Sequence, residues 1–294
     1  MINNKIVIFG ASGFIGNHLY NFLKKNNYEV LFISRKSIKS DFVDYLNFNN
    51  LKNFPNKYHN AFCAINLMHD YKSNKQNEKL INTVINCIKK NNINNLIYFS
   101  STKVYKMIEG KNKYNINSEL DLNSDYSNSK IKSETLIAEL SEDRTFNFII
   151  LRIPHVIGRN GNLNFRILLF LIKYNIPLPI RNLDSKKNFV GIKLINLFIL
   201  SIIKNNFFEN KIYIICNQQL FSVKDIATFM AKKYNKRLIT FVIPRFFINI
   251  MSLFIKKIEI LKFYQQEQIF DVQYPHFFNK EIKTLNLSDD LKEL

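Results

Sequence analysis

The amino-acid sequence predicts an α/β fold, in which a doubly wound parallel sheet carries helices on both faces. Two observations lead to this expectation. A strand-like run, a glycine turn and a helical run open the chain, and strand-length and helix-length apolar segments alternate behind them. This alternation favours a parallel sheet, because each helix carries the chain back to the edge where the previous strand began. From about Ser222 the pattern becomes mostly helical, which predicts a smaller second lobe.

The elements follow from their apolar patterns. Lys5–Phe9 is an apolar, β-branched run of strand length, apolar residues recur at helical spacing from Leu19 to Leu23, and Tyr28–Ile33 is the expected second strand. Further strands are expected at Ala61–Leu67, Asn95–Ser100, Phe146–Leu151, Lys187–Ile192 and Lys211–Cys216, and further helices at Lys79–Lys90, Ser127–Leu140, Lys193–Lys204 and Val223–Lys233 behind Ser222 as N-cap. We expect a sheet domain over 1–158, completed by about 187–217, and a lobe from 159–186 and 218–294.

The glycine turn Gly10–Gly16 has the sequence GASGFIG between a strand and a helix, which is the context of a dinucleotide fingerprint. Gly10 allows the tight turn, Gly13 lets the backbone approach a pyrophosphate, and Gly16 lets the helix pack closely on the strand. The amides at the helix start then face the anion. A turn without a ligand is the alternative, which the flanking pattern makes the weaker interpretation.

The end of the second strand indicates which dinucleotide is preferred. An acidic residue there would bind the ribose 2′-OH of NAD, but Ser34 occupies the position and Arg35 and Lys36 follow it. A small neutral residue followed by two cations suits the 2′-phosphate of NADP, although both cations are also explained as ordinary loop charges. We expect NADP(H) to be favoured over NAD(H).

A set of hydroxyl and amine side chains predicts the reaction chemistry. Ser101 ends an apolar strand, where ligands of a doubly wound sheet bind, and Tyr126 and Lys130 lie four residues apart on one face of a helix. A lysine ammonium about 4 Å from a phenol oxygen favours phenolate by roughly 4 kcal/mol at a dielectric of 20. Such a tyrosine can exchange a hydroxyl proton while hydride moves to or from a nicotinamide. Each motif alone also arises by chance; their order along the chain makes the assignment.

Composition favours an enzyme of the cytoplasm. The net charge is +19, but the lysines are scattered rather than gathered into a stripe, so we expect no nucleic-acid partner. Cys63, Cys87 and Cys216 are expected as reduced core thiols, and no metal-ligand spacing is present. We expect neither a signal peptide nor a membrane span.

At this point the chain resembles the extended short-chain dehydrogenase/reductase family, in its NAD-dependent epimerase/dehydratase branch that acts on nucleotide sugars. Similar segments run over nearly the whole chain: Gly10–Gly16, Phe99–Tyr105, Tyr126–Lys130, Leu151–Gly158, Lys211–Ile215 and Ser222–Ile226. The resemblance implies a Rossmann-type sheet with a substrate-binding lobe, and Ser101, Tyr126 and Lys130 as the catalytic set. The expected cofactor-binding residues are Gly10, Ser12, Gly13, Phe14, Ile15, Gly16, Ser34, Arg35, Lys36, Leu67, Tyr126, Lys130 and Pro154.

Departures from the family pattern cluster around the substrate. Thr102 and Lys103 stand where the dehydratases carry an acidic pair, so we discount dehydration. His155 replaces a frequent asparagine, and Phe189–Leu194 lacks the usual histidine and aspartate. Asn66–His69 is bulkier than the usual pair of alanines beside the cofactor. We expect an unusual sugar, with Thr102, His155, Arg166, Arg181 and Arg245 as substrate-binding residues.

The expected function is hydride transfer at a sugar carbon, C4 of a nucleotide sugar, with an NADPH-dependent 4-keto sugar reductase preferred and a 4-epimerase as the alternative. A non-catalytic dinucleotide sensor or nucleic-acid-binding relative is the rival from another class. A homodimer is the assembly to test. The apolar run Phe246–Phe254 is expected as a core helix, with a membrane-surface segment as the alternative.

Overall fold

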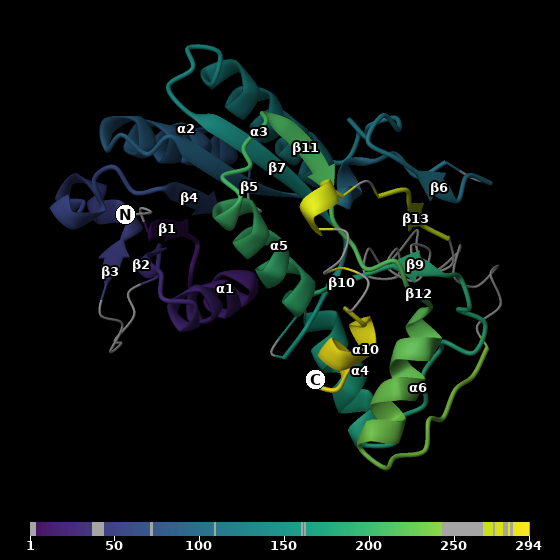
Figure 1. Cartoon of the computed structure of the whole chain (residues 1–294). Coiled ribbons are helices and arrows are strands. Elements are labelled where there is room, and N and C mark those ends of the chain that lie inside the picture. Colours follow the sequence, from purple (N-terminus) through teal and green to yellow (C-terminus); the bar gives the residue numbers. More distant parts are fainter. Residues whose placement is uncertain are drawn as a thin grey trace.

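The computed structural model describes residues 4–36, 44–70, 73–108, 110–159, 161, 163–242, 267–272, 274–278, 282 and 285–293. A sheet of seven parallel strands forms its centre, in the order β3-β2-β1-β4-β5-β7-β11 (Figure 1). The strands are β1 Lys5–Phe9, β2 Glu29–Ser34, β3 Tyr45–Asn47, β4 Cys63–Asn66, β5 Asn95–Ser101, β7 Asn147–Ile153 and β11 Lys211–Ile214. The strand order reverses direction between β1 and β4, which is where a doubly wound sheet opens a crevice.

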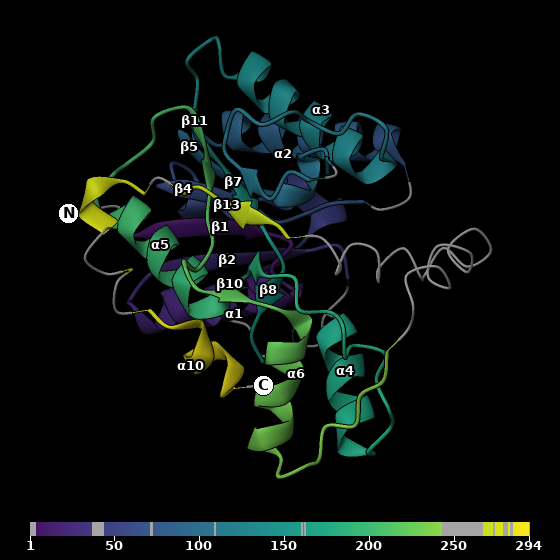
Figure 2. The same cartoon turned by 90° about the vertical axis from the view of Figure 1, so that its right-hand side faces the viewer.

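Helices cover both faces of this sheet (Figures 1 and 2). One face carries α1 Phe14–Lys25 and α5 Ile192–Lys204, and the other carries α2 Asn74–Lys90 and α3 Asp125–Leu140. Strand β1 shows why: Ile6 and Ile8 belong to the α1 core, whereas Val7 and Phe9 belong to the α2 core. Strands buried on both faces read as continuous apolar runs, as the sequence does here. The predicted doubly wound α/β fold is confirmed.

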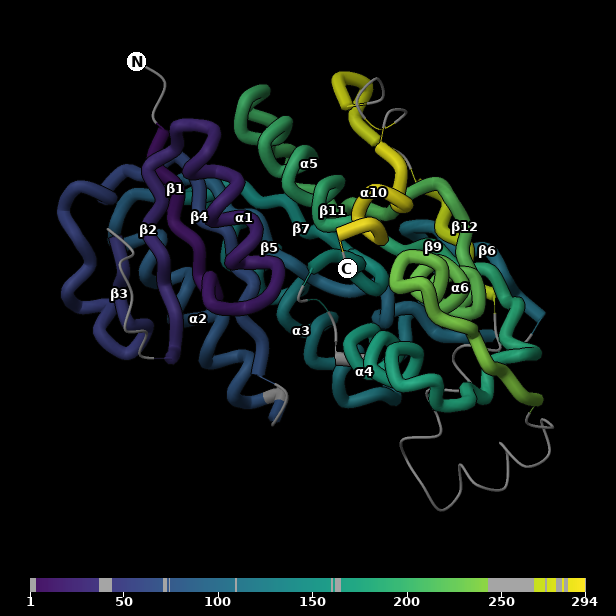
Figure 3. Tube along the Cα trace, turned by 90° about the horizontal axis from the view of Figure 1, so that it is seen from below, coloured from purple at the N-terminus to yellow at the C-terminus, as the bar shows by residue number. Residues whose placement is uncertain are grey.

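A separate lobe lies at one end of the molecule (Figure 3). Helices α4 Leu163–Lys173, α6 Val223–Lys233 and α10 Leu287–Leu291 share a core cluster that includes Phe165, Ile226 and Leu291. The predicted N-cap of α6 is confirmed: the Ser222 hydroxyl accepts a hydrogen bond from the Asp225 amide at 3.1 Å. Short strand pairs join the lobe to the sheet: β8 Val156–Ile157 with β10 Val190–Gly191, β9 Lys187–Asn188 with β12 Leu220–Phe221, and β6 Lys113–Tyr114 with β13 Ile269–Phe270. Short 3-10 turns lie at Phe48–Asn53, Asn56–Tyr58, Thr102–Val104 and His276–Phe278.

Two local expectations differ from the structure. The single strand expected at Lys187–Ile192 is wrong, because β9 pairs with β12, β10 pairs with β8, and the buried Phe189 separates them. Helix α4 was not anticipated; its apolar side chains suit burial in the lobe, and sequence periodicity alone did not single it out.

Asparagine takes the place of glycine behind most of the longer helices. Asn27, Asn92, Asn175, Asn206 and Asn235 follow α1, α2, α4, α5 and α6, with φ angles between 47° and 64°. This left-handed conformation ends helices, and asparagine tolerates it better than other residues with a Cβ. The abundant asparagine therefore has a structural use in a chain with seven glycines.

Candidate active site

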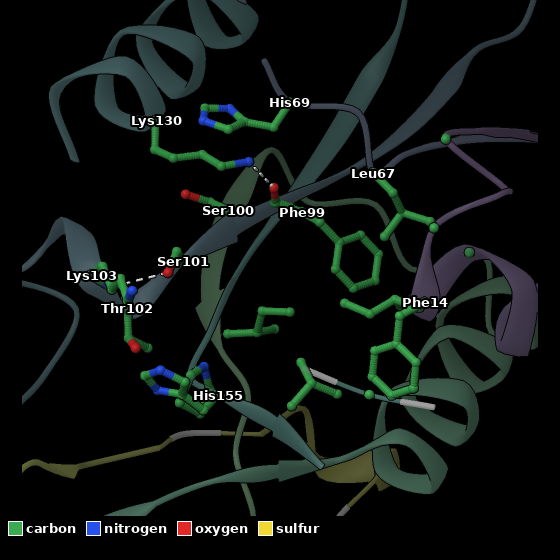
Figure 4. A pocket seen from close by; sticks show the side chains of 18 of the residues that line it. Phe14, Leu67, His69, Phe99, Ser100, Ser101, Thr102, Lys103, Lys130 and His155 are labelled. Carbon is green, nitrogen blue, oxygen red and sulfur yellow. Dashed lines mark hydrogen bonds between the residues drawn. The ribbon is translucent and has the colours of Figure 1, made fainter. Parts of the chain in front are cut away.

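A cavity of about 630 Å³ opens at the carboxyl ends of β1, β4, β5 and β7, beside the point where the strand order reverses (Figure 4). Phe14 and Leu67 lie on one side of it, and Thr102, Lys103 and His155 lie on the other. The cavity brings together these predicted residues: Gly10, Gly13, Phe14, Ile15, Gly16, Leu67, Ser101, Thr102, Tyr126, Lys130, Pro154 and His155.

The glycine turn exposes backbone at its three glycines, beside the side chains of Phe14 and Ile15. Gly10 has a φ of +85°, which L-residues with a side chain rarely adopt. A Cβ on Gly16 would lie 2.5 Å from the Gly10 carbonyl oxygen, so the approach of α1 to the turn requires glycine. Gly13 is the N-cap of α1 and supplies no side-chain cap, and the first turn holds no acidic residue. The free amides of this helix start fit the pyrophosphate of a dinucleotide.

The residues behind the second strand are already engaged with one another. The Ser34 hydroxyl is buried and lies 2.7 Å from the Ser12 hydroxyl. The Arg35 guanidinium pairs with the Asp70 carboxylate at 3.0 Å and donates to the His69 carbonyl at 3.1 Å. A 2′-phosphate would therefore have to compete with Asp70 for this cation. Ser34, Arg35 and Lys36 do not line the cavity described above.

Ser101 and Tyr126 reach the cavity from β5 and from the first turn of α3. The Ser101 hydroxyl accepts a hydrogen bond from the Lys103 amide at 3.2 Å, which fixes its position at the strand end. The His69 ring meets the Tyr126 ring edge to face at a centroid distance of 5.1 Å. The Lys103 ammonium lies over the Tyr126 ring, 5.7 Å from its centroid.

Lys130 lies one helical turn behind Tyr126 and is buried. Its ammonium donates to the Phe99 carbonyl oxygen at 2.8 Å (dashed in Figure 4) and to the Tyr98 hydroxyl at 3.3 Å. Burial lowers the pKa of Lys130 to about 7, against the opposing effect of the Glu134 carboxylate. Both partners are neutral oxygens, so neither offsets the positive charge of Lys130 when it is protonated.

A buried polar network behind this set was missed from the sequence. The Ser100 hydroxyl donates to the Glu134 carboxylate, which also accepts from the Arg152 guanidinium at 2.6 Å. Arg152 in turn donates to the Tyr105 hydroxyl at 3.0 Å. These contacts connect β7 to β5, which carries Ser101, and to α3, which carries Tyr126. Two signals were available: Glu134 lies one turn beyond Lys130, and Arg152 interrupts an apolar strand.

Two histidines of the cavity are neutral at physiological pH. Burial and the nearby Lys130 charge lower the pKa of His69 to about 3, against the opposing effect of Asp70. Burial and the charges of Lys103 and Lys187 lower the pKa of His155 to about 3. His69 lines the cavity and belongs to the bulky segment Asn66–His69 noted in the sequence, although it was not among the predicted site residues.

Of the predicted arginines of the lobe, Arg166 and Arg181 do not line the main cavity. Arg166 lines a second cavity of about 370 Å³ on α4, which shares Gly161 with the first. Arg181 is exposed on a loop, where its backbone amide donates a hydrogen bond to the Phe241 carbonyl. Arg245 and the run Phe246–Phe254 lie outside the described residues.

Three further observations concern the described part of the chain. All three cysteines are buried and form no disulfide. Within the described ranges, no group of three or more His, Cys, Asp and Glu side chains could hold a metal ion. Of the helices that the structure describes, none has the length and apolarity to cross a membrane.

Comparison with solved structures gives full-length matches of low identity. UDP-N-acetylglucosamine 4-epimerase from Bacillus cereus is 17% identical, with a TM-score of 0.75 over 98% of this chain and 97% of that chain. UDP-glucuronic acid 4-epimerase from Bacillus cereus, solved with NAD, is 16% identical, with a TM-score of 0.72 over 98% of this chain and 94% of that chain. RMD from Pseudomonas aeruginosa, solved with NADPH, is 14% identical, with a TM-score of 0.72 over 99% of this chain and 97% of that chain.

These structures share the fold of this chain. No match was found among curated proteins. The sequence model of the NAD dependent epimerase/dehydratase family matches residues 6–187, which is more than half of the chain. The resemblance noted in the sequence is thereby confirmed, and the protein is an enzyme of the extended short-chain dehydrogenase/reductase type that belongs to the NAD-dependent epimerase/dehydratase family.

Proposed function

We propose that this enzyme transfers hydride between a nicotinamide dinucleotide and C4 of a nucleotide-linked sugar, and that it acts as an epimerase. One observation carries the proposal: the glycine turn at Gly10–Gly16, Ser101 and Tyr126 line the same cavity, with Phe14 of the turn on one side and Ser101 on the other (Figure 4). A dinucleotide held on the first wall would present its nicotinamide to a sugar held on the second. When bound, that cofactor accepts hydride from the sugar carbon and returns it.

Each catalytic side chain then has one task. The Tyr126 phenolate takes the proton of the sugar hydroxyl as hydride leaves the carbon, and returns it when hydride comes back. The Ser101 hydroxyl holds the same sugar oxygen in line. The Lys130 ammonium, 4% exposed, supplies a positive charge behind Tyr126 that stabilises the phenolate form.

Epimerisation is preferred to dehydration and to net reduction. Among the described residues that line the cavity there is no carboxylate, so the acid and base for eliminating water are missing there. An epimerase needs no outside reductant, because the hydride it removes returns to the opposite face of the same carbon. Two of the similar solved structures are 4-epimerases, and that likeness supports the proposal without extending to their particular sugars.

A 4-keto sugar reductase using NADPH is the second candidate. Its support is the missing carboxylate at Ser34 with Arg35 and Lys36 behind it, together with the NADPH bound to RMD. The Arg35–Asp70 pair weakens this support, because a 2′-phosphate would have to displace the Asp70 carboxylate from the guanidinium. A preference for NADP(H) over NAD(H) is therefore a proposal, and it does not decide between reduction and epimerisation.

The remaining residues are assigned by position. We propose that Thr102 and His155 contact the sugar, and that Arg166 on α4 reaches the nucleotide end through the second cavity, which adjoins the first at Gly161. Arg181 is the weaker candidate, since it lines neither cavity. A homodimer and a cytoplasmic location stay predictions.

The test combines two assays with one variant. Protein loaded with NAD is incubated with UDP-sugars and the products are read by NMR; separately, NADPH consumption is followed with nucleotide 4-keto sugars. Interconversion of C4 epimers supports the epimerase, and NADPH consumption without interconversion supports the reductase. Tyr126→Phe should lower turnover by about 10²- to 10⁴-fold with an unchanged melting temperature, whereas Tyr28→Phe, directly before β2 and outside both cavities, should not lower turnover. No turnover with any sugar, together with a salt-dependent gel shift on nucleic acid, would favour the non-catalytic alternative.

A further inference from the structure

Lys103 places a positive charge directly beside the proposed proton acceptor. Its ammonium lies over the Tyr126 ring, and the side chain lines the cavity next to Thr102 and His155 (Figure 4). Its backbone is held at both ends: the amide donates to the Ser101 hydroxyl at 3.2 Å, and the carbonyl accepts from the Ser127 hydroxyl at 2.6 Å. The charge is therefore carried on a fixed stretch of backbone, between the two proposed catalytic hydroxyls.

No carboxylate in the described ranges neutralises this charge. Lys103 makes no ion pair with a described residue, and the described lining of the cavity contains neither aspartate nor glutamate. The neighbouring Lys106 differs in this respect, because it pairs with Glu119 outside the cavity. Lys103 is exposed, and desolvation of its ammonium still lowers the pKa of Lys103, an effect that an anion bound beside the ammonium would oppose.

A second lysine strengthens the positive potential at the same place. Lys187, on β9, is 2% exposed, and both Lys103 and Lys187 act electrostatically on His155. Lys187 does not line the cavity, and burial lowers its pKa to about 7 against the opposing effect of the Glu267 carboxylate. With His155 neutral, the described lining at this end of the cavity carries the Lys103 charge and no carboxylate. A cavity of this kind lowers the free energy of an anionic group more than that of a hydroxyl group.

On the basis of the proposed function, we propose that Lys103 binds a carboxylate of the sugar, so that the substrate is a nucleotide-linked uronic acid. The position of the ammonium decides which anion it meets. With the C4 hydroxyl at Tyr126, the neighbouring substituents are those of C3 and C5, and the C5 substituent of a uronic acid is its carboxylate. The anomeric carbon and its diphosphate lie across the sugar ring, away from Tyr126. Lys103 is thus a specificity-determining residue, which the acid–base steps of the reaction do not need.

The test compares two sugar nucleotides that differ at C6 alone. Binding of UDP-glucuronate and UDP-glucose to the NAD-loaded protein is measured by calorimetry, and turnover of both is measured by NMR. We expect UDP-glucuronate to bind about ten- to a hundredfold more tightly, as befits a charge-assisted hydrogen bond. Lys103→Met should remove this difference by weakening UDP-glucuronate and leaving UDP-glucose unchanged. Lys103→Arg should retain most of the difference, and the matched control Lys106→Met should retain all of it.

The outcomes separate this inference from the proposed function. Turnover of both sugars with equal affinity, or an equal loss of both in Lys103→Met, would overturn the role of Lys103 and leave the hydride-transfer function standing. Preferential binding of UDP-glucuronate that Lys103→Met abolishes, without any turnover, would support the carboxylate site and contradict the function. Failure of both sugar nucleotides to bind would contradict both.

Discussion

The two walls of the active-site cavity are built from different parts of the chain. The cofactor wall comes mainly from one short segment, Gly10–Gly16, whose three glycines expose backbone beside the side chains of Phe14 and Ile15. The sugar wall consists of side chains from separate segments, among them Lys103, Tyr126 and His155. The first wall can serve only a ligand that binds to amides at a helix start. The second can change its ligand by a single substitution, so the choice of sugar resides there.

The same contrast appears in the two buried cations near the site. Arg152 is paired with Glu134, and the hydrogen bonds of this pair connect β7, α3 and β5. Lys130 is bonded to neutral oxygens and its pKa is lowered to about 7. We therefore expect Arg152 to stabilise the fold and Lys130 to lower its stability in exchange for activity.

The largest effect is expected from Arg152→Met. Removal of one partner leaves the Glu134 carboxylate buried without its counter-charge, which costs about 3–5 kcal/mol of unfolding free energy. Urea denaturation followed by circular dichroism measures this loss. The control Arg237→Met, on an exposed arginine, should change the free energy by less than about 0.5 kcal/mol. A loss below about 1 kcal/mol for Arg152→Met would show that the network is not structural.

Gly16→Ala tests the wall made of backbone. The added Cβ would lie 2.5 Å from the Gly10 carbonyl oxygen and 2.7 Å from the Ala11 Cα, so the turn must shift. We expect a loss of about 3 kcal/mol of stability and a loss of NAD binding by calorimetry, although alanine favours helix over glycine by about 1 kcal/mol. Asn21→Ala on the exposed side of the same helix is the control. Unchanged NAD affinity in Gly16→Ala would contradict the assignment of this turn to the cofactor.

Lys130→Met is expected to have a smaller effect, of opposite sign on stability. A lysine whose pKa falls from about 10.4 to about 7 on folding lowers the unfolding free energy by roughly 4 kcal/mol at pH 7. The substitution removes this cost, but it also removes two hydrogen bonds, each of which contributes about 1 kcal/mol to the stability of the wild type. The variant should therefore be about 2 kcal/mol more stable at pH 7 and inactive.

The pH dependence of stability independently checks the sign of the Lys130→Met effect. Between pH 7 and 10.5 the folded wild type binds fewer protons at Lys130 than the unfolded chain does, so its stability rises with pH in that window. The advantage of Lys130→Met should be largest at or below pH 7, vanish at about pH 9 and reverse towards pH 10.5, where only the loss of the two hydrogen bonds remains. A pH-independent difference between the two proteins would contradict the lowered pKa.

The comparison of the two walls also explains what the sequence could predict. The strand Lys5–Phe9, the glycine turn and the helix behind it are contiguous, so local pattern was enough for the cofactor wall. Ser101, Tyr126 and Lys130 could be brought to one cavity because the carboxyl ends of parallel strands meet at one edge of the sheet.

Contacts between distant segments were out of reach. The partnership of Glu134 with Arg152 and Ser100 depends on the register of three elements, which no local pattern records. The split of the expected strand Lys187–Ile192 depends on which partners its two halves find in the lobe. The ion pair of Arg35 with Asp70 likewise connects segments behind two different strands, and it weakens the support for NADP(H) as the preferred cofactor.

The most direct test of the account uses sugars that carry deuterium at C4. NAD-loaded protein is incubated with UDP-glucuronate and with UDP-glucose, each deuterated at that carbon, and the product is analysed by NMR and mass spectrometry. We expect a product with inverted configuration at C4 that retains the deuterium, because the hydride leaves and returns within one site beside Tyr126. Absence of inversion, or inversion with loss of the label to water, would contradict it.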